Sequence, residues 1–229
     1  MFRMTCVAGA LLLVSSSLCF AGDFYVGGGL GPEFADFRQD STVQSKGGVA
    51  GTFYVKNQSH LAAKGIFGTV FAGYGEVFST ERQDFYLAGE VNFNLSTANL
   101  TSYNKEFINM TFSKSDYRVQ RSLGISLLPG ILLTDTTLLY GRVGFSEGKF
   151  RVATTDPSLR KSSKYYNGFR YGFGLGQGVT EDWAIRVEYS DVAYRNVEML
   201  TRDPISAVTK GTTISPQTSQ TEFSLVYSF

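Results

Sequence analysis

Large apolar residues alternate with small or polar residues in separate stretches along this chain, and a period of two is the pattern of β-strands. The last stretch is TEFSLVYSF, residues 221–229. One side of this strand carries Phe223, Leu225, Tyr227 and Phe229, and the other carries Glu222, Ser224, Val226 and Ser228. A chain end usually frays into water, so such an apolar row needs a partner that buries it. That partner is either a protein core or a lipid bilayer.

The alternation and the connections together define the predicted fold. We expect strands at about 23–31, 64–76, 84–95, 117–133, 137–148, 168–178, 183–193 and 220–229. Short connections at 77–83, 134–136 and 179–182 alternate with long polar ones at 32–63, 96–116, 149–167 and 194–219. This pattern predicts an all-β fold: an eight-stranded antiparallel up-and-down transmembrane β-barrel with short periplasmic turns and long extracellular loops. Between the fourth and fifth strands we place the turn at 134–136 and interpret Pro129 as a bulge.

The two faces of the predicted strands decide between a soluble barrel and a membrane barrel. In FYLAGEVNFNL (85–95) one face is aliphatic and aromatic, whereas the other carries Glu90 among small and amide residues. A narrow barrel has room inside only for small residues and a few polar ones, while lipid favours Leu, Val and Phe. The apolar face is therefore expected to contact lipid. Arg121 is an exception, because the alternation of its strand places it on the outward, apolar face. We expect it at the outer rim, near lipid headgroups.

The N-terminal segment has the order of a secretory signal. It contains a basic residue at Arg3, an apolar run at 7–14 and small residues near Ala21. We predict a signal peptide at 1–21 and an outer-membrane barrel domain at 22–229, with a lipoprotein site at Cys19 as the alternative. The apolar run is too short for a membrane-spanning helix, which needs about 20 residues.

Composition argues against several kinds of partner and site. Without Arg3, 20 of the 21 basic residues remain beside 20 acidic residues, so nothing suggests a nucleic-acid partner. Both cysteines lie in the predicted signal, and no Cys or His cluster offers a metal site. The single histidine, His60, falls in the first predicted loop, where it lacks a strand-borne serine to activate. We therefore expect no enzyme activity, no metal and no cofactor.

Four charged residues occupy positions of the predicted strands that face the inside of the barrel. They are Glu90, Arg142, Arg186 and Glu188. Charges inside a narrow barrel must be paired or solvated, because a lone buried ion costs several kcal/mol. We expect Glu90 and Arg186 to meet across the lumen, with Arg142 and Glu188 keeping the local charge balanced.

A family resemblance rests on several of these motifs in their order and spacing. FYLAGEVNF, SLGISLLPGILLTDTTLLYGRVGF, GLGQGVTEDWAIRVEYS and the terminal LVYSF resemble the transmembrane domain of outer membrane protein A and related small surface-antigen barrels of Gram-negative bacteria. The resemblance covers essentially all of 23–229 and implies the outer membrane as the location. It also implies that the terminal aromatics, Tyr227 and Phe229, are an assembly signal. By the same resemblance, Glu90 and Arg186 match an acid–base pair that plugs the lumen.

The same resemblance bears on gating. A lysine that alternates partners in that family's proposed gate is replaced here by Ser122. We therefore favour a structural plug over a switching gate.

Three classes of function remain open. The leading one is a structural, surface-exposed antigen or adhesion-type protein whose four long loops bind host or cell-surface ligands. The second is a narrow, porin-like channel for ions or small solutes. The third, a lipid A-modifying enzyme, lacks a Ser–His pair. The expected partners are outer-membrane lipid and lipopolysaccharide, the barrel-assembly machinery, and the ligands of the loops.

Overall fold

The computed structural model describes residues 23–46, 52–105, 112–154, 162–202 and 208–229, and these residues form only strands and short turns. The strands are Phe24–Lys46 (β1), Thr52–Ser79 (β2), Asp84–Ser96 (β3), Asn99–Lys105 (β4), Phe112–Thr134 (β5), Thr137–Thr154 (β6), Ser162–Gly178 (β7), Trp183–Tyr194 (β8), Val197–Arg202 (β9) and Val208–Ser228 (β10). No helix among these residues is long and apolar enough to cross a membrane. The predicted signal at 1–21 lies outside the described residues.

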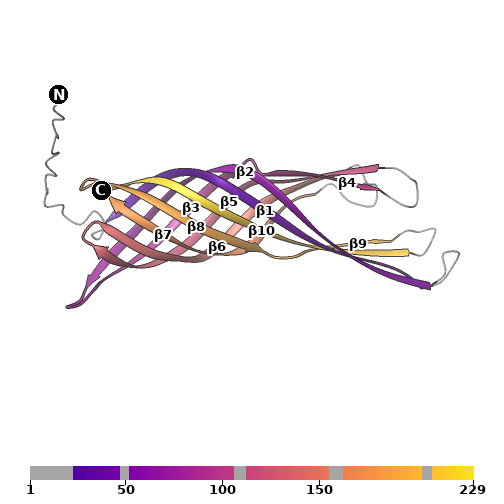
Figure 1. The fold of residues 1–229 in the computed structure, drawn as a ribbon, viewed down its shortest axis with the longest axis horizontal. Coiled ribbons are helices and arrows are strands. Elements are labelled where there is room, and N and C mark those ends of the chain that lie inside the picture. Colours follow the sequence, from indigo (N-terminus) through magenta and orange to yellow (C-terminus); the bar gives the residue numbers. More distant parts are fainter. Residues whose placement is uncertain (1–22, 47–51, 106–111, 155–161, 203–207) are drawn as a thin grey trace, which may run out of the picture.

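The strands close into an antiparallel ring (Figure 1). Its hydrogen-bonded order is β1-β10-β8-β7-β6-β5-β3-β2, and β2 pairs with β1 to complete the circle. β4 follows β3 after a break at 97–98, and β9 follows β8 after a break at 195–196, so these two short strands extend existing walls. The predicted eight-stranded up-and-down barrel is confirmed. Closure leaves no unpaired edge along the barrel wall.

Tight turns join the strands at one end of the barrel, which we call the turn end. They lie at 80–83, 135–136 and 179–182, within the short connections predicted at 77–83, 134–136 and 179–182. The C-terminus lies at this end too (Figure 1). The backbone N–H of Phe229 donates to the carbonyl oxygen of Phe24 at 3.0 Å, so the last residue is hydrogen-bonded to the first strand.

The predicted bulge at Pro129 is wrong. Leu127 pairs with Val143 and Gly130 with Tyr140, so the register of β5 on β6 is the same on both sides of the proline. Proline lacks an N–H group and interrupts the hydrogen bonding here without inserting an extra residue. The register shifts of this pair lie instead between Val119 and Arg121 and between Leu132 and Thr134.

The four long connections are mostly strand, contrary to the prediction of long loops. β1 runs to Lys46 before β2 begins at Thr52, and β6 runs to Thr154 before β7 begins at Ser162. Beyond the barrel the ring separates into two open sheets, which we call wings (Figure 1). The first wing contains β9 and the outer parts of β10, β1 and β2; the second contains β4 and the outer parts of β5, β6 and β7.

Pairing across the two gaps ends near the rim of the barrel. Among the described residues, β2 pairs with β4 only at Lys64 and Asn99, and the pairing of β7 with β8 ends at Gly168 and Tyr194. The wings are therefore separate sheets above this level. Most residues of the wings are polar, so their strands lack the alternating apolar pattern from which strands are recognised in a sequence.

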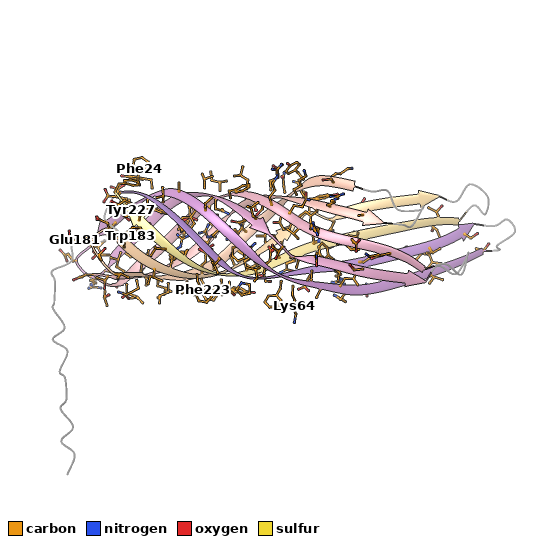
Figure 2. The ribbon with its side chains drawn as sticks, turned by 90° about the horizontal axis from the view of Figure 1, so that it is seen from above. Phe24, Lys64, Glu181, Trp183, Phe223 and Tyr227 are labelled. Carbon is orange, nitrogen blue, oxygen red and sulfur yellow. The ribbon has the colours of Figure 1, made fainter. Side chains whose placement is uncertain are left out.

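The predicted faces of the barrel strands are confirmed. On β3, Leu87 and Val91 are about half exposed, whereas Glu90 is 2% exposed. The aromatic side chains Phe24, Trp183 and Tyr227 gather outside at the turn end, and Phe223 lies further along the outer surface (Figure 2). Arg121 points outward at the other rim, as its parity predicted, and donates a hydrogen bond to the hydroxyl of Tyr165 at 2.7 Å.

Candidate functional site

The inside of the barrel is layered along its axis. On β8 the buried positions read Ala184, Arg186, Glu188, Ser190 and Val192, from apolar through charged and polar back to apolar. An apolar cluster closes the turn end: Tyr25, Phe71, Tyr86, Ala88, Leu128, Leu132, Leu138, Tyr140, Ala184 and Val226. A second closes the wing end: Ala35, Phe37, Ala63, Ala98, Tyr117, Val119, Phe150, Val192, Tyr194 and Ile214. The charged layer lies between them, and Arg186 also lines a cavity at the turn end together with Tyr25 and Tyr86.

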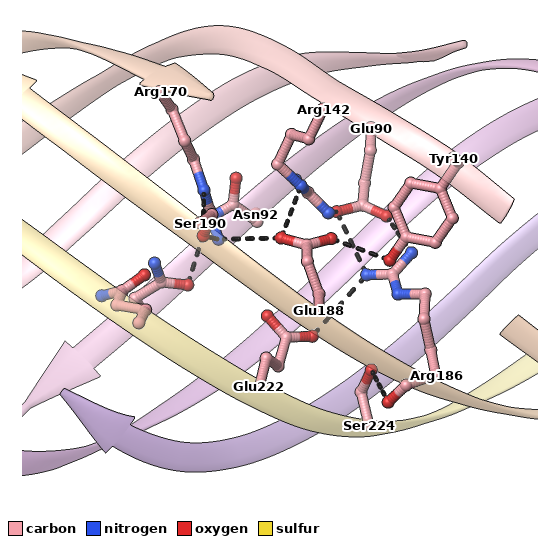
Figure 3. A network of polar contacts seen from close by, with 12 residues as sticks. Glu90, Asn92, Tyr140, Arg142, Arg170, Arg186, Glu188, Ser190, Glu222 and Ser224 are labelled. Atoms are coloured by element: carbon pink, nitrogen blue, oxygen red, sulfur yellow. Dashed lines mark hydrogen bonds and ion pairs between the residues drawn. The ribbon is translucent and has the colours of Figure 1, made fainter. Parts of the chain in front are cut away.

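Glu90 is one acceptor centre of the charged layer (Figure 3). Its Oε2 accepts from Arg186 Nη1 at 2.7 Å, and its Oε1 accepts from Arg142 Nη2 at 2.6 Å. The hydroxyl of Tyr25 donates to Oε2 at 3.1 Å. The carboxylate is therefore held by two guanidinium groups and a phenol, arranged so that both oxygens are engaged.

Glu188 is the second acceptor centre. Arg142 Nε lies 2.7 Å from its Oε1, a close ion-pair contact that is not aligned as a hydrogen bond. Arg170 Nη2 lies 3.4 Å from the same oxygen, and the hydroxyl of Tyr140 donates to Oε2 at 2.8 Å. Arg142 thus bridges Glu90 and Glu188, and the structure brings together all four residues singled out in the sequence (Figure 3).

Arg186 is held by aromatic rings as well as by carboxylates. Its guanidinium carbon lies 4.1 Å from the centre of the Phe71 ring and 5.6 Å from that of Tyr140. Glu222 lies 3.6 Å from Nη2. A cation beside aromatic faces gains favourable energy, which suits a fixed arrangement.

Three buried charged residues of the lumen were missed by the sequence analysis. Arg170 and Glu222 have the same inward parity as the predicted four, so parity was the signal that could have found them. Glu33 fell in a segment predicted to be a loop. It is 1% exposed, and it accepts hydrogen bonds from Ser96 and, at 2.7 Å, from Gln220. The described lumen therefore holds four carboxyl groups and three guanidinium groups.

The terminal aromatics lie outside the barrel at the turn end. Tyr227 packs between Trp183 and Phe229, with ring centres 5.0 Å and 5.1 Å away. Phe229 is 70% exposed on the protein alone. This placement leaves the last residue accessible, and its role as an assembly signal stays a prediction.

His60 lies on strand β2, not in a loop as predicted. It pairs with Arg38 of β1 and is exposed, as expected for a solvated side chain. Among the described side chains, no serine is hydrogen-bonded to it. In the same part of the chain, no three His, Cys, Asp or Glu side chains are grouped in a way that could hold a metal ion.

Comparison with known sequences identifies relatives of this chain. The sequence model of the outer membrane protein β-barrel domain family matches residues 6–229. Outer membrane protein X of Escherichia coli (strain K12) is 33% identical over 89 residues, which cover 39% of this chain and 51% of that protein. The chain thus spans about half the length of the curated relatives it matches.

Two solved structures are similar over most of the chain. Ail, the attachment invasion locus protein of Yersinia pestis, has a TM-score of 0.40 and 16% identity, over 91% of this chain and 99% of that one. The outer membrane protease OmpT of Escherichia coli has a TM-score of 0.49 and 11% identity, over 90% of this chain and 97% of that one.

Proposed function

We propose, given that this chain belongs to the family of outer membrane protein β-barrel domains, that it is a sealed membrane anchor that presents two β-sheet wings for binding at the cell surface. The barrel lies in the outer membrane, as its relatives do. The observation that carries the proposal is the continuation of the strands well beyond the apolar outer band. β1, for example, leaves the band near Phe34 and continues to Lys46.

The closed lumen supports an anchor over a channel. The ionic layer lies between two apolar clusters, and in the wing-end cluster Phe150 contacts Phe37 and Tyr194, with ring centres 6.3 Å and 4.7 Å away. An ion crossing the barrel would have to displace both clusters and break buried ion pairs. We therefore expect no measurable single-channel conductance in planar bilayers, and regular conductance steps would contradict the anchor.

The wings support a binding role. Each wing ends on strands that have no neighbour on one side among the described residues: β9 and β2 in the first wing, β4 and β7 in the second. Unpaired backbone N–H and C=O groups of this kind can accept an added strand from another protein. Host or cell-surface proteins are the partners that this geometry suits best.

A truncation that keeps the barrel tests the proposal. Gln39 pairs with Ser59 and Glu198 with Thr213, so Asn-Gly in place of 40–58 and of 199–212 shortens both halves of the first wing near its base. Ser102 pairs with Ser115 and Arg151 with Ser163, so Asn-Gly in place of 103–114 and of 152–162 shortens both halves of the second wing. Bacteria that display each variant are compared with bacteria that display the intact protein for adhesion to host cells. Adhesion should fall with at least one truncation, and equal adhesion by the doubly truncated, correctly folded barrel would refute the proposal.

A further inference from the structure

We propose that a groove on the outer face of the first wing, near its base, binds an arginine side chain of an extended peptide. The groove is a cavity of about 660 Å³ lined by Asp36, Arg38, Asp40, His60, Asn196 and Gln217, among others. This volume is typical of ligand sites in proteins. The proposal gives the binding role of the wings a partner chemistry, so it rests on that proposed function.

The strand register builds a row of charges into the groove. Arg38 of β1 is directly opposite His60 of β2 on one side and Ser215 of β10 on the other. Asp36 and Asp40 lie two residues before and two residues after Arg38, so the three side chains project from the same face of β1. Two residues of strand span about 6.6 Å, and this distance sets the spacing of the acid–base–acid row.

A bulge shapes the wall of the groove where β8 ends and β9 begins. The register on β10 changes by one residue there, because three residues of this segment, 194–196, stand opposite two of β10, 215–216. An extra residue of this kind bends the strand and redirects its side chains. Asn196 Oδ1 accepts a hydrogen bond from Ser215 Oγ at 2.7 Å. The bulge therefore holds an amide group beside the charged row.

The charged row contains one more acid than base. Arg38 Nε lies 3.7 Å from Asp40 Oδ2. Among the described residues, Asp36 has no hydrogen-bond or ion-pair partner, and the second oxygen of Asp40, Oδ1, is shielded from solvent but accepts no hydrogen bond. A shielded acceptor without a donor costs free energy. The groove therefore lacks a cation and an N–H donor, and a ligand that supplies both would complete it.

The surroundings of Asp36 suit a guanidinium group. Asp36 is directly opposite Gln217 of β10 and Ala62 of β2, so no neighbouring cation competes for its carboxylate and the alanine leaves space. The described residues hold no group of three His, Cys, Asp or Glu side chains that could bind a metal ion, which favours an organic cation. Arginine can donate two parallel hydrogen bonds to one carboxylate.

The length of the groove indicates a peptide as the source of the guanidinium group. Positions 36 and 40 lie about 13 Å apart along β1, which is more than one guanidinium group spans. A second donor of the same ligand is therefore needed at Asp40 Oδ1, and a backbone N–H of an extended peptide supplies one. The neutral polar side chains of Asn196, Ser215 and Gln217 lie along the same cavity and suit further peptide groups.

The test uses the full mature protein folded in a nonionic detergent. The capped peptide Gly-Gly-Arg-Gly-Gly is titrated and its affinity is measured by NMR, with the same peptide carrying neutral citrulline in place of arginine, and with spermidine, as comparison ligands. The variants are Asp36→Asn alone and Asp36→Asn with Asp40→Asn. The matched control is Asp135→Asn with Asp182→Asn, which removes two exposed carboxylates from the turn end. Heat-dependent migration in SDS gels checks that each variant is folded.

Each outcome decides the proposal. The arginine peptide should bind the Asp36→Asn variant about tenfold more weakly than the native protein, while the control keeps native affinity. The citrulline peptide should bind the native protein about tenfold more weakly than the arginine peptide does. Equal affinity of the groove variants and the control for the arginine peptide would overturn the site. Spermidine binding as tight as that of the peptide would overturn the assignment to a peptide.

The groove and the wings fail separately. Both groove variants leave the unpaired edges of the wings intact, whereas the truncations described above remove them. A native protein that does not bind the arginine peptide, but loses adhesion when its wings are truncated, would overturn the groove and leave the binding role of the wings in place.

Discussion

Glu90 and Arg186 lie 2.7 Å apart although they stand on opposite walls of the barrel. Three strands separate β3 from β8 in either direction round the ring, β5, β6 and β7 one way and β2, β1 and β10 the other. Their contact shows that the lumen is narrow enough for one glutamate and one arginine to bridge it. The pair therefore ties the sheet together across its diameter, which suits a fixed plug in an anchor.

We expect Glu90→Ala to destabilise the barrel by about 3–5 kcal/mol, because the change leaves Arg142 and Arg186 buried without their shared carboxylate. The double variant Glu90→Gln with Arg186→Met should be milder than the sum of its single changes, since neither ion is stranded. The measurement is the temperature at which the folded band converts to the unfolded band in SDS gels. Glu181→Ala, in an exposed turn, is the control. Strict additivity would show that the two side chains are not coupled.

Tyr140→Phe should cost about 1–3 kcal/mol, because it removes the hydroxyl that donates to the buried carboxylate of Glu188. The ring remains, so its packing against Arg186 is kept. The loss of stability therefore measures the contribution of the hydrogen bond. Tyr171→Phe is the control, since its side chain is 42% exposed on the outer face. Unfolding in urea with lipid vesicles present gives the free energies. Equal stability of the two variants would mean that Glu188 does not need this donor.

Gly174→Ala should destabilise the barrel by about 1–3 kcal/mol through overpacking. A Cβ at Gly174 would overlap the ring and hydroxyl of Tyr140, which the charged layer holds in place. At Gly89 a Cβ would meet no heavy atom within 4 Å, so Gly89→Ala is the matched control. Thermal conversion on gels is again the readout. If Gly174→Ala converted at the same temperature as Gly89→Ala, Tyr140 would be able to move aside at little cost in free energy.

Phe229→Ser should lower the amount of barrel assembled in the outer membrane. The residue ends the closing strand, is exposed, and corresponds by family resemblance to the signal read by the assembly machinery. Phe145→Ser is the control, because Phe145 is exposed to a similar extent on the outer face (66% against 70%) but lies within β6. Protease-resistant protein in outer-membrane fractions is quantified for both. An undiminished yield of Phe229→Ser would remove the proposed role of the terminal aromatic.

The alternation of apolar with small or polar residues was enough to predict the barrel strands and the face that each side chain occupies. Each barrel strand contacts lipid on one face and a small lumen on the other, so the identity of Leu87 or Glu90 already indicates which side it occupies. The inward orientation of Glu90, Arg142, Arg186 and Glu188 follows from that one physical difference, whereas the tight turns were recognised from the short connections between strands. The outward position of Arg121 followed from the same parity.

Tertiary structure alone decided which inward residues touch and where the strands end. Parity cannot show that Arg142 bridges two glutamates, because the stagger between strands sets the height of each side chain in the lumen. Glu33 joins the lumen because β1 continues beyond residue 31, where the sequence analysis ended this strand. The wings carry no apolar alternation, since most of their residues are polar. Backbone hydrogen bonds hold the strands of the wings together. Such pairing does not require a repeating residue pattern in either strand, so it could not be predicted from the sequence.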